Sequence, residues 1–199
     1  MDTESEAKFY INGPAQLEQR LRTMGARLIQ GRTHELNLRF DTPARDLGRA
    51  GSLLRLRRDE AARLTYKGEA HASGGAVSRR EIEFSVGNFE AARRLLESLG
   101  YEIVFIYEKM RSTYAVPDAM VMLDELPYGN FVEIEGSLDA LQPVAAQLGL
   151  DWTAATPASY HSLFERLCEA RQLHMRDLTF EDLQTLRVSA QDLGLRPAD

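Results

Sequence analysis

The sequence lacks the features that define several common classes of protein. It contains a single cysteine, Cys168, so no disulfide can form within the chain. Cys168 lies in a stretch with helical apolar spacing, which favours a buried, unreactive thiol over a catalytic nucleophile. No apolar run approaches the roughly 20 residues of a membrane-spanning helix, and the N-terminus has no apolar signal segment. We therefore expect a cytoplasmic protein with no membrane partner.

Positive charge is also too scarce for a protein that coats nucleic acid. The net charge is −6 and the isoelectric point is about 5.3, so we expect no nucleic-acid partner, although a local basic pocket stays open. The 199 residues, of which 44% are hydrophobic, are sufficient for one domain with a buried core. We place that domain at residues 1–172 and expect a C-terminal helical extension at 173–199.

What the sequence does contain is charge at alternate positions. Glu4, Glu6 and Lys8 are separated by small residues, and on a β-strand alternate residues face the same side. Taken alone, this stretch is typical of an edge strand with one solvated face. The same alternation of charged and apolar residues recurs at 53–57, 63–67, 79–84, 108–114, 121–124 and 131–135.

Three of these strands begin a similar unit of strand, turn and amphipathic helix. The units start at 4–6, 81–83 and 133–135, and their helical stretches end at Gly25, Gly100 and Gly149. Leucine pairs four residues apart predict a buried helix face in the first two units: Leu17 with Leu21, and Leu95 with Leu99.

The polar faces of the strands are almost purely ionic, whereas an ordinary solvated face mixes charged residues with Ser, Thr and Gln. A closed sheet has an interior and an exterior, so helices on the apolar exterior would leave the charges in a lumen. Buried charges are costly unless they are paired or bind ions. The lumen is therefore either a structural ion-pair network or a binding site, and we favour the binding site.

The types of charge indicate what such a lumen would bind. Arg and Lys bind phosphate oxygens, and clustered carboxylates bind hard divalent cations. A cavity that holds both suits a polyphosphate with its metal, such as Mg²⁺ with a triphosphate.

Seven further motifs accompany E-x-E-x-K in a fixed order, and together they resemble the CYTH superfamily, also called triphosphate tunnel metalloenzymes. They are R-F-D-T-P (39–43), L-R-L-R (54–57), T-Y-K-G (65–68), R-E-I-E (80–83), E-K-M-R (108–111), L-D-E-L (123–126) and F-V-E-I-E-G (131–136). The resemblance covers about residues 1–165. It implies an α+β fold built on a closed eight-stranded antiparallel β-barrel that forms a tunnel, with a triphosphate substrate and Mg²⁺ or Mn²⁺ as cofactor.

The resemblance also implies roles for individual residues. Glu4, Glu6, Glu133 and Glu135 correspond to metal ligands, with Asp124 assisting through water. The expected substrate-binding cations are Lys8, Arg39, Arg55, Arg57, Lys67, Arg79 and Arg111. Glu81 and Glu83 would hold a second metal or orient the attacking water, and Lys109 corresponds to a catalytic lysine that partners a tyrosine.

The chain departs from the family pattern in two places. Arg39 replaces the tyrosine that usually precedes F-D-T-P, and no His-Phe pair precedes Glu4, as it does in cyclase-type members. The second departure favours a metal-dependent phosphohydrolase acting on tripolyphosphate, thiamine triphosphate or a nucleotide. A class IV adenylyl cyclase that makes cyclic AMP and pyrophosphate is the first alternative. A non-catalytic triphosphate or polyphosphate binder is the second, and a purely structural charged barrel is the last.

The C-terminal region has weaker signals. Residues 161–170 and 179–193 both show helical apolar spacing, and the second helix could pack on the barrel or on the second subunit of a homodimer. His161 and His174 are expected on helix surfaces, and the last residues, 196–199, are expected to be loose. His71–Gly75 is expected to be a hairpin loop.

Overall fold

The computed structural model describes residues 3–199, and their side chains from Ser5 onward. The strands are β1 (Thr3–Ile11), β2 (Arg27–Asp41), β3 (Leu53–Arg58), β4 (Ala62–Lys67), β5 (His71–Ser73), β6 (Ala76–Val86), β7 (Glu102–Val116), β8 (Ala119–Leu126) and β9 (Gly129–Gly136). The helices are α1 (Pro14–Thr23), α2 (Asp46–Arg49), α3 (Phe89–Ser98), α4 (Leu138–Gln147), α5 (Tyr160–Arg171) and α6 (Phe180–Leu183), with 3₁₀ turns η1 (Trp152–Ala154) and η2 (Ala190–Leu193). Among these residues, no helix combines the length and apolar character that crossing a membrane requires.

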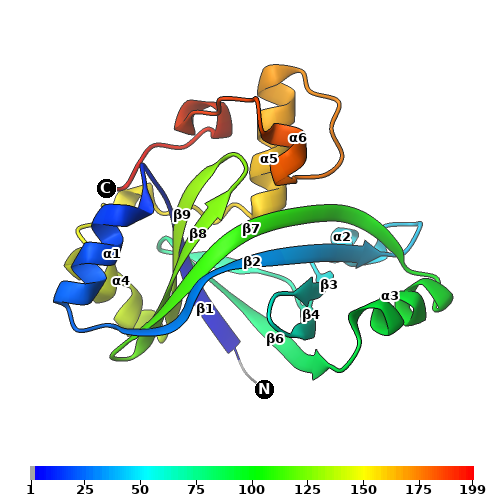
Figure 1. The fold of residues 1–199 in the computed structure, drawn as a ribbon, viewed down its shortest axis with the longest axis horizontal. Helices are drawn as coiled ribbons and strands as arrows, with labels where there is room; N and C mark the ends of the chain where they lie inside the picture. The colour runs from blue at the N-terminus through cyan, green and yellow to red at the C-terminus, as the bar shows by residue number, and fades with distance from the viewer. Residues whose placement is uncertain (1–2) are drawn as a thin grey trace.

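The strands form one antiparallel sheet that returns on itself. Its order is β1-β9-β8-β7-β2-β3-β4-β6-β5, and β1 also pairs with β6. Eight strands thus follow one another in a ring. The short β5 pairs with the first residues of β6, and β4 pairs with the rest of that strand. The long strands β2 and β7 run side by side across the molecule, and helices lie at both ends and above them (Figure 1). The antiparallel α+β architecture expected from the sequence is confirmed, with a ring-like sheet that includes a ninth strand.

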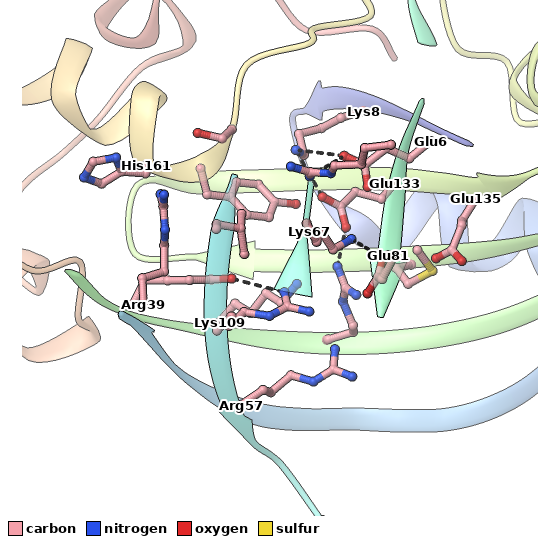
Figure 2. Close-up of a pocket in the computed structure, with 18 of the residues that line it drawn as sticks. Glu6, Lys8, Arg39, Arg57, Lys67, Glu81, Lys109, Glu133, Glu135 and His161 are labelled. Atoms are coloured by element: carbon pink, nitrogen blue, oxygen red, sulfur yellow. Dashed lines mark hydrogen bonds and ion pairs between the residues drawn. The ribbon is translucent and has the colours of Figure 1, made fainter. Parts of the chain in front are cut away.

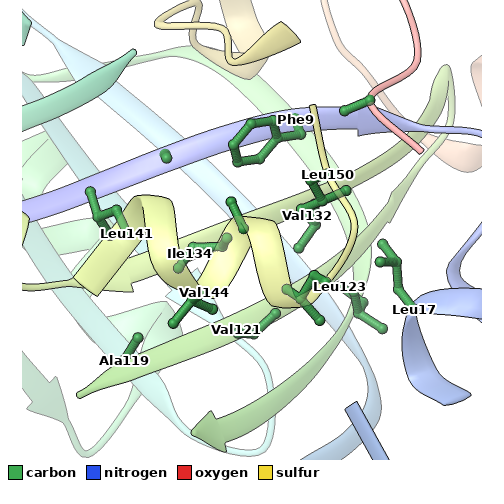
Figure 3. Packing of buried hydrophobic residues seen from close by; sticks show 14 of the residues in the cluster. Phe9, Leu17, Ala119, Val121, Leu123, Val132, Ile134, Leu141, Val144 and Leu150 are labelled. Atoms are coloured by element: carbon green, nitrogen blue, oxygen red, sulfur yellow. The ribbon is translucent and has the colours of Figure 1, made fainter. Parts of the chain in front are cut away.

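Along each strand, alternate side chains face opposite sides of the sheet, as expected. On β1, Ala7, Phe9 and Ile11 are buried against helices outside the ring. Figure 3 shows this packing, where α4 covers β1, β8 and β9 through Leu141 and Val144. The predicted burial of Leu17 and Leu21 on α1 is confirmed. The alternate residues of these strands therefore face the ring interior.

The prediction for the second helix is wrong. Leu95 and Leu99 on α3 are 60% and 65% exposed, whereas Phe89 and Leu96 are buried against β2 and β3. The helix contains Leu95 and Leu96, and Leu99 is its C-cap residue. Only Leu96 faces the sheet, because α3 is rotated relative to the face that the four-residue spacing suggests. The homodimer expected from the sequence is a separate matter, and it stays a prediction.

The hairpin loop expected over residues 71–75 is confirmed only as a turn at Gly74 and Gly75, because residues 71–73 form the strand β5. Ser73 pairs with Ala76, which leaves Gly74 and Gly75 as a two-residue turn. Both glycines have positive φ, 57° and 91°, as the tightest hairpin turns require. Trp152 closes over the turn and donates its indole N–H to the Gly74 carbonyl at 2.9 Å.

The C-terminal segment is part of the core rather than a loose tail. Leu178 pairs with Tyr107 beside the stretch of β7 that β8 leaves uncovered, and the Leu178 N–H donates to the Ile106 carbonyl at 2.8 Å. Leu183 and Leu193 are buried with α5 in a second cluster. At the end of the chain, the Ala198 N–H donates to the Tyr10 carbonyl at 2.9 Å, so the expectation of a loose terminus is wrong.

The single helix expected over 179–193 is also wrong. The structure has two short helical pieces, α6 and η2, and each begins at its own N-cap. Thr179 accepts from the Asp182 N–H, and Ser189 forms a capping box with Asp192. The second cap starts a new turn where the sequence pattern suggested continuation.

Candidate active site

The ring encloses a cavity of about 440 Å³, within the usual range for small-molecule sites. Strand residues with interior parity line it, together with the start of α5 (Figure 2). The cationic side chains are Lys8, Arg39, Arg55, Arg57, Lys67, Arg79, Lys109 and Arg111. The carboxylates are Glu6, Glu81, Glu83, Glu133 and Glu135. The structure thus brings together all of the sequence-predicted site residues except Asp124, which lies behind the wall, and Glu4, whose side chain is outside the described residues.

Two carboxylates face each other directly across neighbouring strands. Glu6 of β1 pairs with Glu135 of β9, and both line the cavity. Like charges at directly opposed positions repel each other. Lys8 lies 3.9 Å and Arg79 lies 3.8 Å from the Glu6 carboxylate, and both distances are beyond hydrogen-bond length. The pair therefore offers oxygen ligands whose repulsion a bound cation would relieve.

These residues fit a magnesium-like ion. In the part of the chain whose side chains are described, no three acidic, His or Cys side chains converge closely enough to hold a metal by themselves. Mg²⁺ commonly takes only one or two carboxylates and completes its shell with water and substrate phosphate. Glu6 and Glu135 supply that pair of carboxylates.

Lys8 and Arg111 hold Glu133 beside this pair. The Lys8 ammonium lies 3.2 Å from Glu133, and Arg111 donates to the other Glu133 oxygen. Burial alone would raise the pKa of Glu133, but Lys8, Arg111 and Lys109 lower it well below its usual value. Burial would likewise lower the pKa of Lys8, but Glu133 and Glu6 outweigh it and raise that pKa. Glu133 is therefore an ionised carboxylate that anchors two cations of the cavity wall, Lys8 and Arg111.

Asp124 is buried behind the cavity wall and is not part of its lining. It is 1% exposed and accepts hydrogen bonds from Lys109 at 3.0 Å, Arg111 at 2.5 and 2.6 Å, and the Tyr160 hydroxyl at 2.7 Å. Arg111 lies directly opposite Asp124 in the β7–β8 register, which explains the two-pronged contact. The expected water-mediated metal role stays a prediction, while this geometry makes Asp124 the group that positions Lys109 and Arg111.

Glu35 is a second buried anchor, and sequence reasoning missed it. Its carboxylate lies 3.4 Å from Lys109 and 3.7 Å from Arg57. Burial would raise the pKa of Glu35, but Lys109, Arg111 and Arg57 lower it to about 2. The available signal was the alternation of Glu35, Asn37 and Arg39 between Leu36 and Leu38, which puts all three on the interior face.

Acid should destabilise the protein through Glu35. Its pKa is about 2 when folded and 4.5 ordinarily, so the stabilisation is complete above pH 4.5 and is lost as pH falls toward 2. We expect Glu35 to contribute on the order of 3 kcal/mol to this pH dependence. Denaturant unfolding of wild type and Glu35→Gln from pH 7 to pH 2.5 tests this. If the free energy of unfolding changed with pH in the same way for the two proteins, this prediction would be contradicted.

Glu81 and Glu83 lie on β6, which pairs with β1, the strand that carries Glu6. Glu81 is 2.7 Å from Lys67, its direct partner in the β4–β6 register. Glu83 accepts from the Thr65 hydroxyl at 2.7 Å and lies within 3.7 Å of Arg55 and Arg57. Glu83 therefore orients two arginines.

Three lining residues with rings were not predicted: Tyr107, Tyr160 and His161. Tyr107 accepts from Arg55 at 3.4 Å, and although burial would raise its pKa, Arg55 and Lys109 lower it. The Tyr160 ring lies under the Lys8 ammonium, 4.4 Å from its centroid. His161 lies on a helix with a side chain that is 33% exposed, as expected, and it also lines the cavity because the first turn of α5 lies at one end. Only Tyr107 carried a sequence signal, being two residues before Lys109 on the same face.

Comparison with known proteins identifies the family to which the chain belongs. The sequence matches the CYTH domain family over residues 2–146, and the chain belongs to this family. A Methanocaldococcus jannaschii protein, provisionally named an adenylate cyclase, is 27% identical over 137 residues, or 68% of this chain and 77% of that protein.

Solved structures show the same fold. A Vibrio parahaemolyticus protein, also provisionally named an adenylate cyclase, superposes with a TM-score of 0.75 at 22% identity, over 82% of this chain and 98% of its own. A Hippeastrum protein, described as an adenylyl cyclase candidate with a dominant triphosphatase activity, gives a TM-score of 0.60 at 20% identity, over 81% and 95%. Names within this group of relatives thus divide between two reactions of triphosphates.

Proposed function

We propose that this chain is a metal-dependent phosphohydrolase that cleaves a triphosphate within the ring, which acts as a closed eight-stranded tunnel. The observation that carries the proposal is the cavity lining, where eight cationic side chains surround the opposed carboxylates of Glu6 and Glu135. Cations in this number suit several phosphoryl groups, and opposed carboxylates suit a divalent cation such as Mg²⁺ or Mn²⁺.

In this proposal the chain mainly positions and stabilises charge, as is usual in phosphoryl transfer. Glu83, Glu35 and Asp124 hold Arg55, Arg57 and Arg111, and all three arginines line the cavity. Lys109, fixed between Glu35 and Asp124, stabilises charge on the leaving phosphate. Glu81 is the cavity carboxylate that orients the attacking water. Glu6, Glu135 and Glu133 would hold the metal, which supplies charge neutralisation on the phosphate oxygens.

Adenylyl cyclase activity is the second candidate, and the names of the relatives favour it. Both reactions need the same phosphate-binding cations, but a cyclase also needs a surface for adenine. Besides its charged groups, the cavity offers Leu53, Met122, Ser159 and three ring side chains, of which Tyr160 is covered by Lys8. We therefore place hydrolysis first.

Product analysis by ³¹P NMR separates these functions. The protein is incubated with Mg²⁺ or Mn²⁺ and either ATP or tripolyphosphate, with EDTA and Glu6→Gln as controls. Orthophosphate formed in a metal-dependent way, and absent with Glu6→Gln, is the expected result. Pyrophosphate with cyclic AMP from ATP would establish the cyclase instead. Thermal stabilisation by tripolyphosphate without any product would leave a binding protein.

A further inference from the structure

Arg39 differs from every other cation in the cavity. The remaining seven lining cations each have a carboxylate oxygen within 4.0 Å. Among the side chains that the structure describes, Arg39 has no ion pair and no hydrogen-bond partner, and its Nε is buried without one. The groups that favour its charged form are Tyr107, then Glu165 and Asp41, and none of them lies within ion-pair or hydrogen-bond distance. Arg39 is thus a guanidinium whose counterion is not supplied by the neighbouring side chains.

The position of Arg39 adds to its need for an anion. Across the β2–β3 register it lies directly opposite Arg55, whose Nε is also buried without a partner. Like charges at opposed positions repel, and an unpaired buried charge is costly. Burial lowers the pKa of Arg39, so the surroundings disfavour its charged form. A bound anion would satisfy both arginines.

The groups around Arg39 suit an anion. The start of α5 faces this end of the cavity with Ser159 and His161, and a twelve-residue helix directs free N–H groups and its positive dipole end there. The His161 ring packs on Phe105 with centroids 4.4 Å apart. The nearest acid on α5, Glu165, is 3.7 Å from His161 Nδ1, and it is not among the cavity-lining residues.

Arg39 and His161 lie together on one side of the site, and Glu6, Glu81 and Glu135 lie toward the other (Figure 2). The proposed metal-binding carboxylates and the unpaired guanidinium are therefore separated within one cavity. We propose that Arg39 and His161 form an additional anion subsite that accepts a phosphoryl group beyond the three that the other cations hold. The chain then binds a linear inorganic polyphosphate of four or more phosphoryl groups more tightly than a triphosphate. The inference rests on the proposed function only in taking phosphate chains as ligands.

Calorimetric titration with tripolyphosphate and tetrapolyphosphate tests the subsite. EDTA is present throughout, so that metal-dependent turnover does not interfere. Because hydrogen bonds to charged groups are worth more than tenfold in affinity, we expect wild type to bind tetrapolyphosphate at least about tenfold more tightly. Arg39→Gln should reduce that ratio to about twofold, because tetrapolyphosphate should lose more affinity than tripolyphosphate. Arg94→Gln, which removes an exposed arginine from α3, should behave as wild type.

Each contrary result has a distinct meaning. Equal affinities of wild type for the two ligands would overturn the subsite. An equal loss for both ligands in Arg39→Gln would place Arg39 on the triphosphate itself and also overturn it. Arg39→Gln should melt no lower than wild type, because it removes an unpaired buried charge, and the wild-type preference can be measured without any variant. If tetrapolyphosphate is preferred but neither ligand is hydrolysed with Mg²⁺ or Mn²⁺, the subsite stands and the proposed hydrolase fails.

Discussion

Glu6→Gln should lower metal-dependent turnover at least about 10³-fold, because it removes one of the three carboxylates that would hold the cation. Glu6 lies directly opposite Glu135, and both face the cavity. Glutamine keeps the size and one oxygen of the side chain but loses its charge. The measurement is kcat for orthophosphate release from tripolyphosphate across a range of Mg²⁺ concentrations. Glu135→Gln should behave similarly.

The same substitution separates a metal ligand from a structural residue. The ion pairs of Glu6 with Lys8 and Arg79, at 3.9 and 3.8 Å, are too long for hydrogen bonds, so a metal-ligand role predicts that Glu6→Gln melts close to wild type in EDTA. Wild type with tripolyphosphate should gain thermal stability when Mg²⁺ is added, and Glu6→Gln should lose most of that gain. Glu60→Gln, an exposed residue in the β3–β4 turn, is the matched control. A Glu6→Gln variant that melts early in EDTA would instead make Glu6 part of a structural ion-pair network.

The interior of the ring was largely predictable from the sequence because one rule governs it. Side chains alternate between faces along a strand, so Lys8, Arg55 and Lys109 follow from their apolar neighbours without any knowledge of the partner strands. The same rule applied to Glu35 and Asn37, but a single acid beside an amide did not distinguish that stretch from an ordinary strand.

What the sequence could not predict depends on placement in three dimensions. His161 reaches the cavity only because α5 packs over one end of the ring, and nothing in its local spacing signals that position. On α3, burial of Leu96 instead of Leu95 depends on the rotation of the helix against β2 and β3. Arg39 was recognisable as a departure from the family pattern. Arg39 lacks a counterion among the described side chains, and this could be seen only once the neighbouring elements were in place.

Asp124→Asn should produce the largest loss of stability among single substitutions in the site, about 3 kcal/mol or more. Asp124 is 1% exposed, and its two oxygens accept from Lys109, Arg111 and Tyr160. Removing the carboxylate leaves two buried cations short of negative charge, with Glu35 and Glu133 as their remaining partners. For a chain of this size, that loss corresponds to a decrease in Tm of roughly 6–12 °C. Thermal and urea unfolding in EDTA measure it.

The stability measurement decides between two roles for Asp124. A residue that acts only through a metal-bound water would leave unfolding in EDTA unchanged and would affect turnover alone. A residue that positions Lys109 and Arg111 should affect both, and its coupling to the Tyr160 hydroxyl should appear in a double-mutant cycle with Tyr160→Phe. Since the Tyr160 hydroxyl donates to Asp124 at 2.7 Å, the two substitutions together should cost less than the sum of their separate effects. Strict additivity, with no loss of stability in Asp124→Asn, would show that the cations do not depend on this carboxylate and would return Asp124 to the metal site.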